Sequence, residues 1–485
     1  FPVAELKSIT KVLSATPVAT VQSLHVIDLI SQHYACNPWD LIRSAIPPRV
    51  ASVDKSIQGV IVDSSKSSKR TIEFQTLAPF IQAHNQVVRL VQENQGAGSI
   101  LIVAPDEKDV DLIIGALSTI GLSSLKLTAA MPREERYRNY LEAMRRSISI
   151  VVGTRSAIFA PVNNLTTVII HKESSLDHYE VRSPGWNTRT VALIRSEVES
   201  FKLVLTGFSP SIEVSQLIDE REIKYLNAKE SVTVKAFTPS EGALLPGRIF
   251  TDVKKALTTG PVLFMAPRKG YGNALLCAHC RNVAACECGG RLSVSAKGKA
   301  PSCVHCGNSF PAWKCTFCNR DKQYLAGRGI ERAAEEISRA FPNFPVVISA
   351  GEVIKDRIEA KPALVLATPG AQPQVEGGYA AVVILEGLRF FAHTDLRTQE
   401  RARELFLETS SLISPEGSVL LVIDDSHPIV SAIARWNIAP LLKRELSERL
   451  ELKLPPSVFS VVLVMDQAIS MQIANGLKKA AAEGR

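Results

Sequence analysis

The sequence predicts an α/β protein in which two successive lobes, each built on a parallel β-sheet, are followed and interrupted by smaller units. Three observations predict this fold class. Short continuous apolar runs of buried-strand length alternate with helical stretches. The alternation occurs twice, once before and once after residue 250. Eight of the nine cysteines lie close together inside the second series, which indicates an inserted metal-binding module.

The first 49 residues are predicted to form a small helical unit. An amphipathic stretch covers residues 4–14, helical periodicity covers residues 18–34, and a second helix over residues 37–46 should end at Pro47-Pro48. Tyr34 and Trp39 are expected in the core of this unit. Residues 50–70 are rich in Ser and Lys, and we interpret them as a linker.

The first lobe is predicted over residues 71–235. The run SILIVA predicts a buried strand at residues 99–104, and a helix should follow over residues 109–117. Further strands are expected at residues 149–152, 167–170 and 202–205. Strands that alternate with helices favour a parallel sheet covered by helices on both faces.

The second lobe is predicted over residues 236–276 and 319–430, with the cysteine module, residues 277–318, between its two parts. Its strands are expected at residues 262–265, 346–348, 363–367, 381–385 and 418–423. The tail, residues 431–485, should carry a helix and then a strand at residues 458–465. No apolar run approaches the roughly 20 residues of a membrane span, and no secretory signal opens the chain.

The overall composition permits several functions and excludes few. The hydrophobic fraction of 46% and the charged fraction of 21% are typical of a soluble globular protein. A net charge of +8 is compatible with nucleic-acid binding but does not establish it. Since the chain begins with Phe1 rather than Met, we expect its natural N-terminus to be missing.

The cysteines form four closely spaced pairs. Disulfides suit small secreted domains, so a metal site is favoured in this large chain without an export signal. Zinc prefers four tetrahedral ligands, and the C-x2-C turn, or zinc knuckle, aims two thiolates at one point. Gly289 and Gly307 directly follow knuckles, where positive φ relieves crowding.

Two pairings of the knuckles are possible. A sequential pairing joins the first two knuckles, but only five residues separate them, which is tight. We prefer an interleaved pairing, in which an outer zinc is bound by Cys277, Cys280, Cys315 and Cys318, and an inner zinc by Cys286, Cys288, Cys303 and Cys306. Two closed shells of thiolates predict two structural zinc ions per chain. The shortened Cys286-x-Cys288 pair leaves His279 and His305 as alternative ligands.

Several stretches together resemble the primosomal protein N′ family, the PriA-type replication restart proteins. They are VVGTRSAIFAP at 151–161, FMAPRKGYG at 264–272, GRGIERAAEEISRAFP at 327–342, residues 1–49, and Leu454-Pro455-Pro456. The resemblance covers nearly the whole chain. It implies two RecA-like, helicase-type lobes, the end of an N-terminal domain that binds 3′ DNA ends, and the start of a C-terminal domain. Both end domains are expected to be truncated.

The motor motifs of that family are missing. The stretch at the position of the phosphate loop, IEFQTLAPFIQ at residues 72–82, has no glycine and no lysine, and the glycines at 96 and 98 precede a strand, so we interpret them as a turn. His171 and Lys172 replace the acids expected after the strand at 167–170. The arginine finger is absent from FLETSSLI at residues 406–413. Asp424-Asp425 is interpreted as a polar strand end.

Phosphoryl transfer needs a phosphate cradle, magnesium and a positive finger together, so no nucleotide-binding or catalytic residue is predicted. The chain is therefore more similar to the actinobacterial members of the family, which lack helicase motifs.

Two segments are candidate DNA contacts. Thr154 and Arg155 follow a strand and could contact phosphate, although a structural turn explains them equally well. The segment HYEVRSPGWNTR interleaves aromatic and basic residues, as single-stranded nucleic acid requires, while a loop with one packed aromatic is the alternative. Its candidate residues are Tyr179, Arg182, Trp186 and Arg189. A row of arginines, Arg389, Arg397, Arg401 and Arg403, could form a basic face or ordinary solvated surface.

The resemblance implies a replication restart protein that binds forked or single-stranded DNA and helps assemble the primosome, without helicase activity. The implied partners are other primosome proteins, the replicative helicase or its loader, and single-stranded DNA-binding protein, in the cytoplasm and away from membranes. Two alternatives remain open. One is an active ATP-dependent 3′-to-5′ DNA helicase with an unrecognised nucleotide site, and the other is a zinc-ribbon nucleic-acid binder with no primosomal role.

Overall fold

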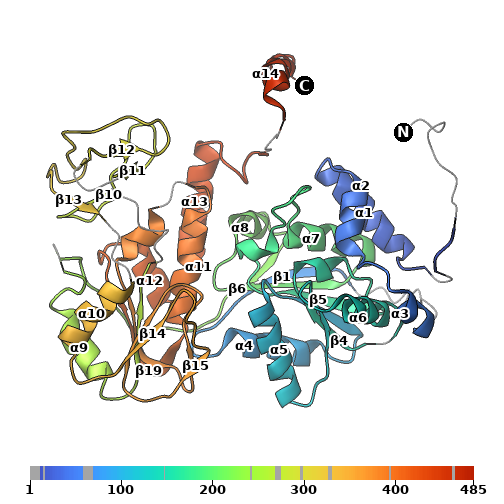
Figure 1. Ribbon diagram of the computed structural model, residues 1–485, viewed down its shortest axis with the longest axis horizontal. Helices are drawn as coiled ribbons and strands as arrows, with labels where there is room; N and C mark the ends of the chain where they lie inside the picture. The colour runs from blue at the N-terminus through green and yellow to red at the C-terminus, as the bar shows by residue number, and fades with distance from the viewer. Residues whose placement is uncertain are drawn as a thin grey trace.

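The computed structural model places two α/β lobes side by side, with a small cysteine-rich module on the second lobe (Figure 1). It describes residues 11–14, 17–57, 69–146, 148–240, 243–267, 275–294, 299–325, 330–392, 395–460 and 465–484. The predicted fold class is confirmed: each lobe contains one parallel sheet, and the cysteines lie in an insertion in the second.

Lobe 1 is a seven-stranded parallel sheet with the strand order β3-β4-β2-β5-β6-β1-β7. Its strands are β1 (Thr71–Thr76), β2 (Ser99–Val103), β3 (Leu125–Leu127), β4 (Ile150–Gly153), β5 (Leu165–Ile170), β6 (Lys202–Gly207) and β7 (Lys224–Leu226). Its helices are α4 (Ala83–Asn94), α5 (Glu107–Thr119), α6 (Arg133–Arg145), α7 (Thr188–Glu199) and α8 (Ile212–Asp219). The strands predicted near residues 99, 149, 167 and 202 are all present.

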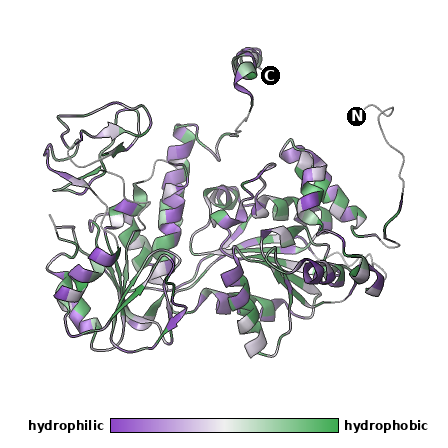
Figure 2. Ribbon diagram, in the orientation of Figure 1, coloured by the Kyte–Doolittle hydropathy of each residue, from purple (hydrophilic) through white to green (hydrophobic). Residues whose placement is uncertain are grey.

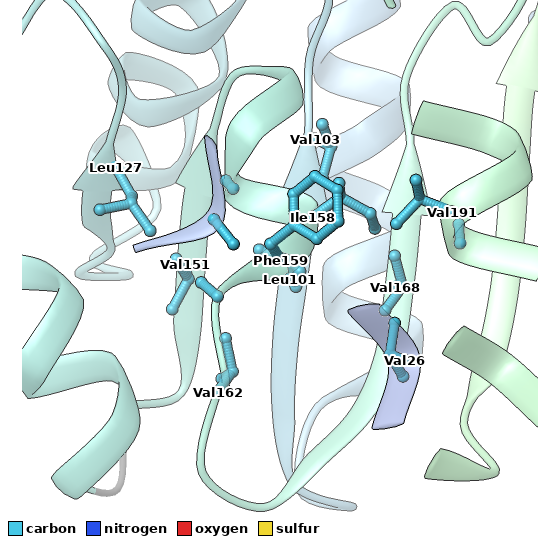
Figure 3. Packing of buried hydrophobic residues seen from close by; sticks show 14 of the residues in the cluster. Val26, Leu101, Val103, Leu127, Val151, Ile158, Phe159, Val162, Val168 and Val191 are labelled. Atoms are coloured by element: carbon cyan, nitrogen blue, oxygen red, sulfur yellow. The ribbon is translucent and has the colours of Figure 1, made fainter. Parts of the chain in front are cut away.

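The apolar run of β2 is continuous because both faces of the sheet are covered. Ile100 and Ile102 pack with residues of α4 and α5, whereas Leu101 and Val103 belong to the cluster on the opposite face. Alternate residues of a strand point to opposite faces, so a strand buried on both sides must be apolar throughout. Figure 3 shows Leu101, Val103 and Val168 within the second of these clusters.

The N-terminal helices share the core of lobe 1. They are α1 (Val21–His33), α2 (Pro38–Ala45) and α3 (Ala51–Ser56), and Val26, Leu41 and Val53 belong to the same cluster as Val168. Val26 lies close to Val168 in Figure 3. Helix α3 occupies part of the segment expected to be a linker, which is a correction; residues 58–68 and residues 1–10 lie outside the described part of the chain.

One expected core residue of this unit is exposed. The side chain of Trp39 is 66% exposed at the start of α2, so placing it in the core was wrong. Tyr34 is half-buried, and its hydroxyl accepts a hydrogen bond from the backbone N–H of Asn187 at 3.1 Å. The apolar face of this unit is therefore provided by its aliphatic residues, which pack against α7.

Lobe 2 is a six-stranded parallel sheet with the strand order β14-β16-β9-β18-β19-β8. Its strands are β8 (Val234–Ala236), β9 (Val262–Met265), β14 (Val346–Ser349), β16 (Leu364–Ala367), β18 (Tyr379–Ile384) and β19 (Ile413–Leu421). The pair β15 (Arg357–Ile358) and β17 (Gln374–Val375) forms a separate small sheet. All five predicted strands are present, although β19 begins earlier than expected.

Helices cover both faces of the second sheet. The helices α9 (Ile249–Ala256) and α10 (Ile330–Ala340) pack on one face. The other face is covered by α11 (Thr398–Ser410) and α12 (Pro428–Ala434), and α13 (Ala439–Glu451) follows these and also contacts α8 of lobe 1. Figure 2 shows the apolar sheets enclosed by helices whose outer surfaces are more polar.

The tail differs from its prediction. Residues 458–460 form no strand, and residues 461–464 lie outside the described residues. Residues 268–272 and 327–329, which belong to the stretches that carry the family resemblance, also lie outside the described residues. The helix α14 (Gln467–Ala482) was not predicted; it has no buried residue and lies apart from both lobes (Figure 1). No helix in the described part of the chain has the length and apolar character needed to span a membrane.

Candidate metal centres and the contact between the lobes

The cysteine module is built from two short antiparallel pairs of strands. The pairs are β10 (Leu275–Cys277) with β13 (Gln323–Leu325), and β11 (Leu292–Ser293) with β12 (Ser302–Cys303). Each knuckle is closed by a backbone hydrogen bond to the carbonyl of its first cysteine: from Arg281 to Cys277, Gly289 to Cys286, Gly307 to Cys303, and Asn319 to Cys315. All four donors have positive φ, between 57° and 81°, and only two of them are the glycines singled out in the sequence.

The knuckles bring the sulfurs together in the interleaved arrangement. In the outer group the Sγ–Sγ distance is 3.4 Å from Cys277 to Cys318 and 3.5 Å from Cys280 to Cys315. In the inner group the distance is 3.7 Å from Cys286 to Cys306 and 3.5 Å from Cys288 to Cys303. Within each group all four sulfurs lie within 4.8 Å of one another.

These distances fit a shared metal ion and do not fit disulfides. A disulfide holds its sulfurs about 2.05 Å apart. Four thiolates at ~2.3 Å from a tetrahedral zinc ion are ~3.8 Å apart, which is close to the observed spacing. Among the described residues, neither group of possible metal ligands contains His279 or His305. The donor set is therefore four thiolates at each site, the chemistry that structural zinc prefers.

The two groups differ in exposure. The outer group has two buried and two half-buried cysteines, whereas the inner group contains Cys288 and Cys306, which are exposed. A small core of Leu275, Leu292 and Trp313 packs with the buried cysteines. The outer sulfurs are thus better protected from solvent than the inner ones.

Polar contacts hold the module on lobe 2. The guanidinium carbon of Arg281, in the first knuckle, lies 3.8 Å from the centre of the Tyr324 ring, and the Tyr324 hydroxyl donates to Glu386 Oε1 at 2.7 Å. Glu386 lies two residues after the end of β18 and also forms an ion pair with the buried Arg389. Arg281 Nη2 donates to the carbonyl of Ser240 at 3.1 Å, so the knuckle is tied to two segments of the lobe.

The loop at the position of a phosphate loop is hydrogen-bonded to the side chain of Gln86, in α4. Between β1 and α4, the amide N–H of Ala78 donates to Gln86 Oε1 at 2.8 Å, and Gln86 Nε2 donates back to the carbonyls of Ala78 and Ile81, both at 3.0 Å. Phe80 has φ of 65°, and its N–H donates to the carbonyl of Ser411 in lobe 2. The loop therefore uses its amides inside the protein.

The turn after β5 is filled by buried polar side chains. Burial lowers the pKa of His171 to about 3, and its Nδ1 lies 3.2 Å from the hydroxyl of Thr206. Glu173 accepts hydrogen bonds from the N–H of Ser211 at 2.5 Å and from Arg189 at 3.0 Å. His171 and Glu173 each have a partner inside the protein, and neither set of contacts resembles a magnesium site.

Helix α11 meets the same edge of lobe 1 with a row of three acids spaced four residues apart. Glu400 Oε2 accepts from the N–H of Ile212 at 3.0 Å, and Glu404 accepts from the N–H groups of Phe208 at 3.2 Å and Ser209 at 2.6 Å. Glu408 accepts from Lys172 Nζ at 2.8 Å. The lobes are thus joined by hydrogen bonds to carboxyl groups along one face of a helix.

One cavity between the described parts of the two lobes is small. A cavity of about 130 Å³ lies beside the turn after β5. Its lining includes His84, Asp106, Asp109, Lys172, Gln372 and Glu408. Sites for small ligands typically measure ~300–1,000 Å³, so this cavity is smaller than a nucleotide site.

The structure corrects several candidate DNA contacts. Trp186 is 1% exposed and packs edge-on against Phe159, with ring centres 4.8 Å apart. Arg189 is also buried, paired with Glu173, because this loop belongs to the interior of lobe 1. Tyr179 is half-buried, with the Arg397 guanidinium 5.0 Å from its ring centre. These three residues offer no open stacking surface.

The remaining candidates have mixed surroundings. Arg182 is exposed. Thr154 is half-buried before the 3-10 helix η2 (Arg155–Phe159), and Arg155 pairs with Glu180 at 3.1 Å. In the row of arginines, Arg403 is buried against Glu445 and Arg397 bridges Glu213 and Glu400, so this row is no free basic face.

Two polar motifs lie where the sequence placed them, one as a turn and one as a polar strand end. Gly96 and Gly98 lie in the turn before β2. Asp424 lies after β19, where its Oδ1 accepts from the N–H of Ser426 at 3.0 Å and from its hydroxyl at 2.6 Å.

Comparisons with known proteins identify relatives. No protein-family model matches the chain. It is 30% identical to a Mycobacterium tuberculosis protein described as a probable replication restart protein PriA, over 93% of this chain and 76% of that protein. The Mycobacterium leprae protein of the same description is 30% identical over 92% and 76%. The replication restart protein PriA of Bacillus subtilis is 25% identical over 44% and 28%.

Solved structures are more distant. Yeast Dbp5 bound to RNA and ADP BeF3 aligns over 84% of this chain and 99% of its own, with a TM-score of 0.38 and 9% identity. The Escherichia coli DExH-box NTPase HrpB aligns over 74% and 40%, with a TM-score of 0.40 and 11% identity. On the extent of its identity to the mycobacterial proteins, the chain belongs to the family of PriA-type replication restart proteins.

Proposed function

We propose that this protein binds DNA at stalled or branched replication forks and helps to assemble the primosome that loads the replicative helicase, without acting as a motor itself. Membership of the PriA family supports the first part. The pairing of Lys172 with Glu408, at the edge where a motor would bind nucleotide, is the observation that carries the second part. Acids that would bind magnesium are replaced there by His171 and Lys172.

The cysteine groups hold two structural zinc ions in this proposal. Cys277, Cys280, Cys315 and Cys318 bind one ion, and Cys286, Cys288, Cys303 and Cys306 bind the other. Closed thiolate shells leave no open coordination position, so the ions order the module and do not catalyse a reaction. The ordered module serves as a platform for partner proteins.

The proposed partners follow from the family. They are forked or single-stranded DNA, other primosome proteins, the replicative helicase or its loader, and single-stranded DNA-binding protein, all in the cytoplasm at the nucleoid. On the DNA side, Arg182 is the best placed of the sequence candidates because it is exposed. Thr154 and Arg155 are retained as weaker phosphate contacts.

The test of the non-motor proposal is the hydrolysis of ATP by the full chain in the presence of forked DNA and magnesium. We expect no turnover above the background rate of the buffer, while an active helicase on the same DNA serves as the positive control. Magnesium-dependent turnover that rises with forked DNA would refute the proposal and establish an ATP-dependent helicase instead.

A second measurement separates fork recognition from simple phosphate binding. Affinity for a fork and for a duplex of equal length is measured across a salt series. Binding through phosphates alone weakens steeply with salt and shows no preference for structure. A fork preference that persists at higher salt is expected here, whereas equal affinity at every salt concentration would favour a nucleic-acid binder without a primosomal role.

A further inference from the structure

Lys172 occupies an unusual position for a lysine. It lies in the turn after β5 with φ of 51°, a left-handed conformation that non-glycine residues rarely adopt. Its side chain is only 18% exposed and points across the gap between the lobes. The left-handed turn thus directs the ammonium group of Lys172 towards lobe 2.

The ammonium group of Lys172 joins the two lobes. Its Nζ lies 3.3 Å from Asp109 in the first turn of α5, and 2.8 Å from Glu408 Oε1 in the last turn of α11. Both acids are mostly buried, with side-chain exposures of 12% and 26%. One cation thus pairs with one carboxylate from each lobe in a poorly hydrated place.

The bridge lies where two motor motifs are missing from the sequence. Lys172 stands after β5, where an acid was expected, and Glu408 lies within FLETSSLI, which has no arginine.

We propose that Lys172 is a positioning residue which, through its bridge to Glu408, holds the two lobes in one closed arrangement that requires no nucleotide. The inference concerns the chain by itself and does not depend on the proposed role at forks. A motor closes its lobes when nucleotide binds and opens them afterwards. In this chain the bridge is present in the polypeptide, so the closed arrangement is permanent.

The surrounding electrostatics support a charged bridge. Burial disfavours the ammonium form, but the carboxylates of Glu408 and Asp109 more than compensate, and the pKa of Lys172 is raised above its ordinary value. A buried charge whose partner is removed is strongly destabilising, because desolvation is then not compensated. Removing either end of the bridge should therefore loosen the contact between the lobes.

The amide groups beside the bridge can report on lobe separation. The N–H groups of Phe208, Ser209 and Ile212 in lobe 1 donate to glutamates of α11 in lobe 2, so they are protected only while the lobes touch. The N–H of Ser211 donates to Glu173 within lobe 1. Hydrogen exchange in peptides covering residues 207–213 therefore measures the contact between the lobes.

The experiment compares the wild type with Lys172→Met, Glu408→Gln and the double variant, on the full zinc-loaded chain. Methionine keeps the length of the lysine but removes its charge. We expect exchange in peptides 207–213 to rise about tenfold or more in each single variant, with no further rise in the double variant, since both changes break one contact. X-ray scattering should show a larger radius of gyration in all three.

The matched control is Lys126→Met. Lys126 forms a comparable ion pair with Asp111, at 2.6 Å, but the pair is exposed and lies within lobe 1. Exchange at residues 207–213 should remain at the wild-type rate in this variant. Zinc content and circular dichroism of every variant verify folding, and Glu408→Gln tests the bridge if Lys172→Met fails to fold.

Two results would overturn the inference. One is wild-type exchange at residues 207–213 in both folded single variants. The other is slower exchange of the wild type when magnesium ATP is added, because a nucleotide would then be closing the lobes. Exchange that does not respond to magnesium ATP supports the permanent closed arrangement, even if no preference for forks is found.

Discussion

Cysteines could be assigned to their sites from the sequence because a zinc knuckle is a local structure. The two sulfurs of a knuckle are aimed by a turn of a few residues, so spacing alone carries the information. The aromatic and basic residues near Trp186 could not be assigned in this way. Arg189 is buried and pairs with Glu173 and Ser211, although the sequence of this segment is equally compatible with an exposed stacking surface. Burial distinguishes the two, and it depends on distant residues.

The shortened inner knuckle leads to a first prediction, at Gly290. A Cβ at this position would lie 2.5 Å from Cys303 Sγ and 2.9 Å from the Cβ of His305. Since a metal-bound sulfur cannot move away freely, Gly290→Ala should displace Cys303 and lower the zinc content from two ions per chain to one, as measured by mass spectrometry of the metal.

The control for this glycine is Gly115→Ala. Gly115 lies in α5, where an added Cβ meets nothing within 4 Å, so the variant should keep both ions. A Gly290→Ala protein that binds two zinc ions with wild-type affinity would contradict the assignment of Cys303 to the inner site.

The acid in the middle of the α11 row leads to a second prediction, on pH. Burial and the charge of Glu408 raise the pKa of Glu404 to about 8, from the ordinary 4.5. Between these values the folded state binds more protons than the unfolded state, so the stability of the contact falls as pH rises through this window. We expect the melting temperature to fall more between pH 5 and pH 8 in the wild type than in Glu404→Gln.

The glutamine variant is neutral at every pH and keeps an oxygen that accepts an amide hydrogen bond. The exposed Glu359→Gln is the control, and its pH profile should follow the wild type. Identical pH profiles for the wild type and Glu404→Gln would show that Glu404 does not titrate in this range.

At the scale of elements, the strands were predicted well and their packing was not. A strand buried on both faces must be apolar throughout, so β2, β9 and β16 are visible as runs of apolar letters. The acids of α11 look like an ordinary solvated face, because their partners lie 188 and 196 residues away in the chain. In the same way, the sequence of α1 and its neighbours does not reveal that this helix packs on lobe 1.

Helix α1 offers a third prediction, with its control on the same helix. Ile30 is fully buried in the cluster shared with lobe 1, whereas Leu24 is 48% exposed. Ile30→Ala should lower the free energy of unfolding by ~2–5 kcal/mol, through lost contacts and a cavity. Leu24→Ala should change it by less than ~0.5 kcal/mol. Urea denaturation followed by circular dichroism measures both, and equal effects would show that α1 is not docked on the lobe.

At the scale of the whole molecule, the sequence indicated the family and the two lobes but not their mutual position. Family resemblance depends on stretches that are each continuous in the chain, whereas lobe position depends on pairs such as Leu77 with Trp436. The apolar cluster of lobe 2 includes Leu77 and Phe208 of lobe 1, and these residues pack with Trp436 after α12. The lobes are therefore joined by a shared core as well as by the acids of α11.

Trp436 gives the prediction that tests this shared core. It is 1% exposed, its indole N–H donates to the carbonyl of Leu77 at 2.8 Å, and its ring lies edge-on to Phe208. Removing the ring should cost ~3–5 kcal/mol, part of it from the contact with Leu77 and Phe208 of lobe 1. We expect the wild type to unfold in one calorimetric transition, and Trp436→Ala to unfold in two, because each lobe has its own sheet and core. Trp39→Ala, which removes a tryptophan that is 66% exposed, should keep the single transition. A single transition for Trp436→Ala, shifted down in temperature, would mean that the hydrogen bonds and ion pairs of α11 are enough to keep the lobes cooperative. The calorimetric profile of Trp436→Ala combined with Lys172→Met would then show how much the Lys172 ion pair contributes to that cooperativity.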